Sequence, residues 1–163
     1  MTEDDPRAVT ESLKVDTLQR DLLIPQIQAF VDATSDTAAR NTYLALKSAV
    51  ESMEVAPEHQ ARLGAIVEVA LQSGRIRRLF GPGAELSLHA LFQKTPRGRE
   101  IAESLRELNT ALAKLKGDTV EEMSAALRAP GAWALTVKTS GCQLVIRFEP
   151  GGARVESLEV ALG

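Results

Sequence analysis

The sequence predicts an α+β fold: an N-terminal helical bundle of about five helices, followed by a short helix and a C-terminal three-stranded antiparallel meander. Two observations lead to this prediction. Through about residue 115, apolar residues recur at helical spacing, and from Ala132 they alternate with polar residues as in strands. The 163 residues, of which 44% are hydrophobic and 25% charged, are ordinary for one compact domain or two small ones.

The chain begins with an acidic segment that leads into a predicted helix. Residues 1–15 contain few apolar side chains and no periodic pattern, and we expect them to form a flexible acidic tail. Asp16 and Gln19 have the spacing of a capping box, which predicts a helix start, and an apolar stripe follows through Val31. Pro25 lies inside this stripe and is expected to kink the helix, because proline removes an amide donor.

Capping residues, prolines at first-turn positions and terminal glycines delimit three further helices. They are expected at residues 35–53, 57–73 and 95–116, so that a helical-bundle region spans residues 16–117. The apolar residues of the first and third of these helices alternate steps of four and three, the spacing of a coiled-coil seam. Each seam either packs inside the bundle or is shared between chains, as in a homodimer or a docking surface for a partner helix.

Residues 75–94 fit two assignments. The segment Arg75–Phe80, followed by Gly81-Pro82-Gly83, can form a strand and a turn, and residues 86–92 alternate as a strand does. The apolar residues of 84–92 also form a helical stripe, and alternation over so few residues does not decide between the two. We favour a helix over 84–94.

Residues 118–163 are predicted to form a short helix and a three-stranded sheet that packs on the bundle. Asp118 and Glu121 make a second capping box, which predicts a short helix that stops at Pro130-Gly131. The three strands are expected, in chain order, from Ala132, after the Ser140-Gly141 turn and over Val155–Leu162. A lone small sheet is marginal in water, so helices are expected to cover its apolar face.

The sequence offers few catalytic candidates. It contains neither the Gly-x-Ser-x-Gly motif of hydrolases nor the glycine-rich loops that bind nucleotides. His59 and His89 fall on different predicted elements without a second ligand one helical turn away, and Cys142 is the single cysteine, which excludes a disulfide within the chain. We therefore predict a non-enzymatic protein with no catalytic residues, no metal and no cofactor.

The main electrostatic feature is a basic cluster within residues 74–99, where six basic side chains accompany a single acid, Glu85. These cations, with a phenylalanine as apolar anchor, are the predicted contacts to acidic groups of a partner or to phosphate. The predicted contact residues are Arg75, Arg77, Arg78, Phe80, Lys94, Arg97 and Arg99. In a purely structural role, the arginines would instead solvate a loop, interact with helix C-termini or pair with Glu51, Glu54, Glu100 and Glu103.

Residues 57–108 resemble winged-helix regulators. The features in common are a helix that ends at Gly74, a basic strand at Arg75–Phe80, a wing-like Gly81-Pro82-Gly83 turn and a segment at 94–100 that leads into a C-terminal helix. The resemblance implies DNA binding through the helix at 57–73 and the turn at 81–85. The polar face of that helix carries two acids and one arginine, whereas a helix that enters the major groove is usually basic.

Together these features predict a cytoplasmic binding or regulatory protein that acts through protein–protein interaction, with self-association into a homodimer as one form of it. The strand Val155–Leu162 is a second candidate surface, as an edge that extends a sheet in a partner. The alternative function is a winged-helix-like nucleic-acid-binding regulator that uses the basic segment 75–99. No membrane association is expected, because no stretch approaches the ~18–20 apolar residues of a spanning helix and the N-terminal MTEDDPR is unlike a signal peptide.

Overall fold

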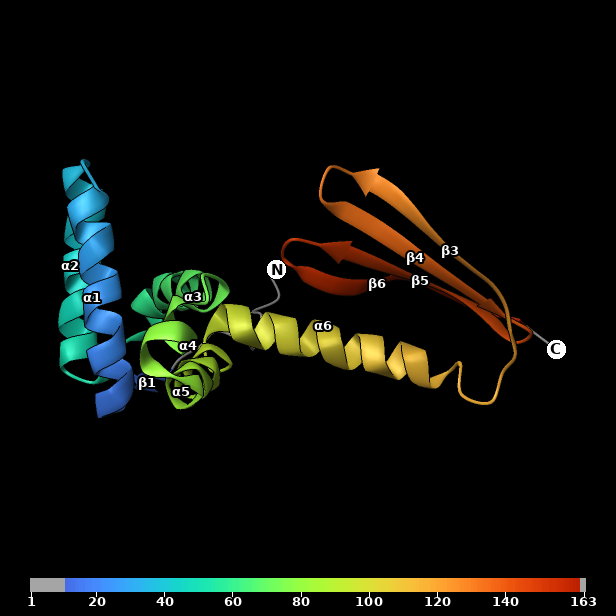
Figure 1. The fold of residues 1–163 in the computed structure, drawn as a ribbon, viewed down its shortest axis with the longest axis horizontal. Coiled ribbons are helices and arrows are strands. Elements are labelled where there is room, and N and C mark those ends of the chain that lie inside the picture. The colour runs from blue at the N-terminus through green and yellow to red at the C-terminus, as the bar shows by residue number, and fades with distance from the viewer. Residues whose placement is uncertain (1–10, 162–163) are drawn as a thin grey trace, which may run out of the picture. The chain divides into compact units, whose positions relative to one another are not determined.

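The computed structural model describes residues 11–161 and confirms the α+β class (Figure 1). The chain divides into two compact units, Met1–Arg99 and Glu100–Gly163. In the described residues, the first unit holds five helices, the start of a sixth and a two-stranded sheet, and the second holds the rest of that helix and a four-stranded sheet. Over the same residues, no helix combines the length and the apolar character needed to cross a membrane.

The helices of the first unit are delimited by capping residues, prolines and glycines. In chain order they are α1 (Thr17–Ala33), α2 (Thr37–Glu51), α3 (Pro57–Gln72), α4 (Arg75–Phe80) and α5 (Pro82–Phe92), followed by α6 (Pro96–Ala113), which continues into the second unit. The predicted capping box is confirmed: Asp16 accepts a hydrogen bond from the Gln19 amide at 2.8 Å, and the Asp16 amide donates to Gln19 Oε1 at 3.0 Å. Pro25 lies inside α1, which continues past it.

Residues 75–92 form two helices. The favoured helix at 84–94 corresponds to α5, whereas the candidate strand at 75–80 is the short helix α4. Gly74 has a φ of 66° and Gly81 a φ of 85°, which are left-handed values that glycine adopts at little cost. These two glycines end one helix and allow the next to begin in a new direction, so the segment never extends into a strand.

A short antiparallel sheet corrects the expected N-terminal tail. It pairs β1 (Leu13–Lys14) with β2 (Glu54–Val55), and Leu13 lies opposite Val55. The side chains of Leu13 and Val15 are buried, because they pack as core residues beside this pair. Of the tail predicted over 1–15, residues 1–10 lie outside the described part of the chain, and residues 13–15 belong to the folded unit.

Buried amide side chains connect segments of the helical unit that are far apart in sequence. Gln60 is fully buried, and its Nε2 donates to the backbone carbonyls of Glu11 at 2.8 Å and Val55 at 3.2 Å. Gln19 Nε2 donates to the carbonyl of Ser87 at 3.0 Å. The fully buried apolar side chains of the same unit include Leu23, Ile27, Leu46, Val50, Leu63, Ile76 and Leu88.

The start of α6 is fixed by Thr95, whose side chain is fully buried. Its Oγ1 accepts a hydrogen bond from the Gly98 amide at 3.2 Å and donates to the Phe92 carbonyl at 2.6 Å. Thr95 is therefore the N-cap, and Pro96 takes the first helical position, where its missing amide costs nothing. Gly98 lies so close to the Phe92 carbonyl that an added Cβ would collide with it.

The second unit contains a four-stranded antiparallel meander. Its strands are β3 (Val120–Ala129), β4 (Ala132–Thr139), β5 (Cys142–Glu149) and β6 (Gly152–Val160), hydrogen-bonded in the order β3-β4-β5-β6. The three predicted strands correspond to β4, β5 and β6. The prediction of three strands was therefore one short.

The missing strand is β3, where a short helix was predicted after Asp118. The Asp118 carboxylate does not cap a helix; it accepts a hydrogen bond from the Thr139 hydroxyl at 2.8 Å and so joins the end of β4. Gly131, with a φ of 79°, forms the β3–β4 hairpin turn, where the sequence suggested a helix end. Pairing with β4 along nearly its whole length outweighs the helical preference of the alanines, leucine and methionine in β3.

One face of the sheet is apolar, and α6 covers only part of it. Leu108 and Ala111 of α6 pack against Leu144 and Ile146 of β5. The partly buried side chains around this cluster come from the turn after α6, from β4 and from β6: Leu115, Leu135, Ala153, Val155 and Leu158. The core of the second unit therefore lies under β5 and β6.

Candidate interaction surface

The predicted basic residues lie in the helical unit, on and after α4. Arg75, Arg77 and Arg78 project from α4 and are exposed, as are Lys94 and Arg99. Phe80 ends the same helix with 55% of its surface exposed, beside Leu79 at 61%. The predicted anchor is therefore accessible to a partner, as the hypothesis of a contact surface requires.

Two of the predicted arginines form ion pairs within the chain. Arg77 Nη1 lies 3.2 Å from a Glu85 carboxylate oxygen, and Arg97 Nε lies 3.9 Å from one of Glu68. The acids differ from those considered in the sequence analysis, because α5 and α3 bring Glu85 and Glu68 close. These pairs neutralise part of the basic cluster.

The winged-helix resemblance does not extend to the fold of residues 75–94. The implied basic strand is helix α4, and the Gly81-Pro82-Gly83 turn joins α4 to α5. In the described residues, the strands of the helical unit are the two-residue β1 and β2. A wing needs a hairpin at this position, so the part of the resemblance that implied one is wrong.

The largest apolar exposure in the second unit lies on the sheet, at residues that the sequence analysis did not select. Met123 and Leu127 of β3 are each 60% exposed, Trp133 of β4 is 54% exposed and Phe148 of β5 is 40% exposed. We call these four residues the open sheet face. Leu127, Trp133 and Phe148 lie directly opposite one another on three successive strands, so they form one row.

The open sheet face lies on the same side of the sheet as α6. Met123 is opposite Val137, which is opposite Leu144, and Leu144 packs on α6. Because residues directly opposite in a sheet point to the same face, Met123 shares that face. Burial falls from fully buried at Leu144 to 60% exposed at Met123, since α6 does not reach over β3.

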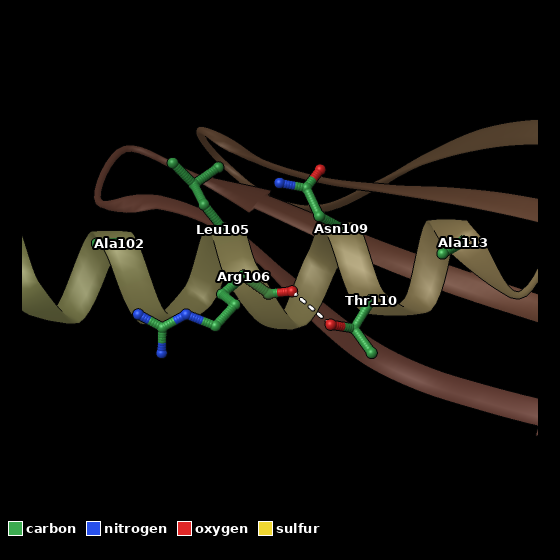
Figure 2. A pocket seen from close by; sticks show the side chains of 6 residues that line it. All are labelled: Ala102, Leu105, Arg106, Asn109, Thr110 and Ala113. Atoms are coloured by element: carbon green, nitrogen blue, oxygen red, sulfur yellow. Dashed lines mark hydrogen bonds between the residues drawn. The ribbon is translucent and has the colours of Figure 1, made fainter.

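One flank of α6 borders this uncovered area. Its other flank meets β6, where Glu107 and Lys114 line a depression of about 420 Å³ with Val155 and Leu158. Leu105 projects from the opposite side of the helix, together with Asn109 (Figure 2). They line a second, shallow depression of about 620 Å³, whose lining is completed by Ala102, Arg106, Thr110 and Ala113.

The predicted coiled-coil seam of α6 is split between these environments. Leu108 is buried against the sheet and Leu115 is partly buried there. Leu105 and Leu112 are 48% and 39% exposed. Part of the apolar stripe of α6 therefore stays exposed beside the part that packs on the sheet.

Chemically reactive groups are scattered in the described residues. His89 is exposed on α5, His59 is half-buried on α3, and Cys142 is a buried free thiol. Over residues 11–161, no three His, Cys, Asp or Glu side chains come together as metal ligands. Lys14 hydrogen-bonds and attracts the Glu54 carboxylate at 3.1 Å, which lowers the pKa of Glu54 below its ordinary value of 4.5.

Trp133 and Phe148 lie on strands that were predicted, whereas Met123 and Leu127 were missed as surface residues of a sheet because β3 was predicted to be a helix. The alternation of Met123, Ala125 and Leu127 was the signal that could have found them. Their chemistry is apolar contact, so the arrangement is suited to binding. No family model, curated protein or solved structure matches the chain, and its function is therefore inferred from its own residues.

Proposed function

We propose that the chain is a non-enzymatic protein-binding module whose sheet docks an amphipathic helix of a partner protein beside α6. The open sheet face is the observation that carries this proposal. Neighbouring strands are about 4.8 Å apart and packed helices about 8–10 Å apart, so one helix covers two strands. Because α6 lies over β5 and β6 and Val137 of β4 is buried, the uncovered part of this face consists of β3 and the row Leu127–Trp133–Phe148 at one end of the sheet.

The size of the exposed surface supports a binding role. At the exposures given above, Met123, Leu127, Trp133 and Phe148 present on the order of 400 Å² of apolar surface. A patch of this order is as large as the largest on a typical monomer and is often functional. Trp and Phe also supply large contact areas at a small cost in side-chain entropy, as residues that dominate binding energies do.

The flank of α6 determines what kind of helix fits. Leu105 and Leu112 offer a side wall at helical spacing, and the row Leu127–Trp133–Phe148 offers a floor. A partner helix would therefore need an apolar stripe broad enough to touch both, as in other cases where a helix binds in a groove. Asn109 on the same flank favours a polar partner residue at that level.

Site-specific photo-crosslinking in cells that express the protein tests this proposal. Benzoylphenylalanine replaces Leu127 on the apolar face, or Ser124 on the polar face of the same exposed strand as a matched control. We expect a discrete adduct with one protein at position 127 and none of it at position 124, with the crosslinked peptide belonging to an amphipathic helix.

A synthetic peptide with the crosslinked sequence then gives a direct measurement. Trp133 is the single tryptophan of the chain, so its emission should shift to the blue when the peptide covers it. Met123→Glu should weaken the peptide by at least about tenfold, because it would desolvate a carboxylate in the contact. Adducts of equal yield at both positions, or an adduct only with a second copy, would overturn helix docking.

A second candidate function is nucleic-acid binding by the helical unit. It is favoured by Arg75 and Arg78, which are exposed on α4 and form no ion pair within the described part of the chain. Anisotropy of a labelled generic DNA duplex, titrated from low to physiological salt, measures it. Binding that is lost on Arg75→Ala/Arg78→Ala but retained in Arg154→Ala would support this function, and no binding at low salt would exclude it.

A further inference from the structure

A different surface of the sheet unit, the outer edge of β3, points to a specific partner. β3 is the first strand in the order β3-β4-β5-β6, and its ten residues are all exposed. In the described residues no strand pairs with its outer side, so alternate backbone N–H and C=O groups face solvent there. The strand contains no proline and no lysine, the residues that commonly protect an edge.

By contrast, β6, the strand at the opposite edge of the sheet, is protected. β6, which includes most of the strand selected from the sequence as an edge, is flanked by α6 across the depression that contains Val155 and Leu158. It carries Arg154, Glu156 and Glu159, and its register with β5 shifts between Val145 and Ile146. Charges and register shifts also occur in β3, which carries Glu121, Glu122 and Arg128 and whose register with β4 shifts at both ends. The difference between the two edges is α6, which flanks β6. The long accessible edge of this sheet is therefore β3.

The sequence of β3 is complementary to itself when two copies run antiparallel. If Ala125 lies opposite Ala125 of the second copy, each Glu122 lies opposite an Arg128, and each Met123 lies opposite a Leu127. Opposite charges and apolar pairs directly across two strands each add stability. Both kinds of pair occur twice, because the arrangement has two-fold symmetry.

Neighbouring registers lose this match. Residues directly opposite each other in two paired strands point to the same face of the sheet, so the symmetry axis between the two copies must pass beside one residue and not between two. The nearest other registers are therefore centred on Ser124 and on Ala126. A centre at Ser124 places Arg128 opposite Val120 and Glu122 opposite Ala126. A centre at Ala126 places Glu122 opposite Pro130, which has no amide for the ladder.

We propose that the chain dimerises through β3, with the two strands paired antiparallel around a two-fold axis at Ala125 to form one continuous sheet. Arg128 already lies 3.6 Å from Glu156 within its own chain, on the polar face. Its guanidinium has five N–H donors, so it can bind Glu122 of the second copy as well. The dimer forms along the backbone edge of β3, and its Met123–Leu127 pairs extend the open sheet face across the two copies. It is tested apart from helix docking, because self-association is measured without peptide.

Charge reversal tests the register. We expect Glu122→Arg and Arg128→Glu each to weaken the dimer roughly thirtyfold, since two attractive pairs become two repulsive ones. The double variant restores both pairs and should return the dissociation constant to near the wild-type value. Arg154→Glu on β6 is the matched control, because Arg154 also pairs with a glutamate of its own chain, Glu149, at 3.5 Å. Sedimentation equilibrium measures all four variants, and the Trp133 emission spectrum checks that each remains folded.

Disulfide trapping tests the geometry separately. In the proposed register the Cβ atoms of residue 125 in the two copies lie about 5 Å apart, whereas those of residue 129 lie roughly 26 Å apart. With oxidised glutathione, Ala125→Cys should therefore give a covalent dimer and Ala129→Cys should not. The wild-type chain, whose Cys142 is buried, is the background control.

Two results would overturn the proposal. One is a chain that stays monomeric up to several hundred micromolar and is not trapped at position 125. The other is a dimer whose dissociation constant is the same in Glu122→Arg, Arg128→Glu and wild type, which would place the interface elsewhere. Neither result bears on the helix-docking function, because that function is measured with peptide and Trp133.

Discussion

Truncating two leucines of the same sheet unit should have very different effects on stability. Leu144 is fully buried between the sheet and α6, and Leu127 is 60% exposed on β3. Leu144→Ala removes buried methyl groups and leaves a cavity, so we expect it to lower the free energy of unfolding by about 3 kcal/mol. Folding removes less than half of the Leu127 surface from water, so Leu127→Ala should cost at most about 1 kcal/mol.

Urea denaturation followed by Trp133 fluorescence measures both effects. Because Trp133 is the single tryptophan and lies on β4, its emission reports the unfolding of the sheet unit alone. With an m-value near 1–1.5 kcal/mol/M for a unit of this size, Leu144→Ala should lower the urea midpoint by roughly 2–3 M and Leu127→Ala by at most about 1 M. The midpoint is the quantity to compare, because Leu127 lies opposite Trp133 and its removal also alters the emission intensity.

Equal losses in the two variants would refute the reasoning. They would mean that Leu127 is covered in the folded protein, so that the open sheet face does not exist in solution. A large difference, combined with weaker peptide binding by Leu127→Ala, would show that this leucine serves association more than folding. The same variant thus separates the two roles.

Three further predictions concern the helical unit. Gly98→Ala should lower the thermal midpoint by more than about 5 °C, as measured by circular dichroism, because its Cβ would collide with the Phe92 carbonyl and force apart the first turn of α6. Thr95→Ala should cost about 1–2 kcal/mol in chemical denaturation and Thr95→Ser much less, because serine keeps the capping hydroxyl. An NMR titration should give Glu54 a pKa below its ordinary 4.5, and Lys14→Ala should raise that pKa. Since the folded pKa is lowered, the Glu54–Lys14 pair stabilises the fold above pH 4.5 and loses this contribution as the pH falls through the lowered value.

The helix boundaries were predictable because their signals are local. The Asp16–Gln19 capping box, Pro57 at the start of α3 and Thr95-Pro96 at the start of α6 act on amides within three residues. Short-range hydrogen bonds depend little on the rest of the fold. For this reason, a capping pattern predicts the start of a helix correctly when the capping side chain has no competing hydrogen-bond partner.

The β3 strand was not predictable in the same way. Asp118 and Glu121 have capping-box spacing, but the Asp118 carboxylate binds the Thr139 hydroxyl, which is 21 residues away. Only the folded sheet supplies that competing donor. The spacing of Val120, Met123 and Leu127 also fits a helix, and the alternation that fits a strand is short.

The candidate surfaces depend on tertiary structure even more. That Arg75 and Arg78 are exposed follows from their charge, but the pairing of Arg97 with Glu68 depends on how α3 and the start of α6 pack. The open sheet face depends on how much of the sheet α6 covers, and no sequence motif encodes that coverage. Sequence patterns give the apolar face of each element, and the folded structure shows which part of that face stays uncovered.

The hydrogen bond from Gln19 to the Ser87 carbonyl has a consequence for folding during synthesis. The bond joins residues 68 positions apart, so the Gln19 amide lacks this acceptor until Ser87 has left the ribosome. At the usual rate of about 5–20 residues per second, α1 waits roughly 3–14 s for it. The sheet of the second unit, in contrast, pairs each strand with the next along the chain and can form as fast as it is synthesised. The helical unit is therefore the part of a nascent chain that is exposed longest to chaperones and proteases.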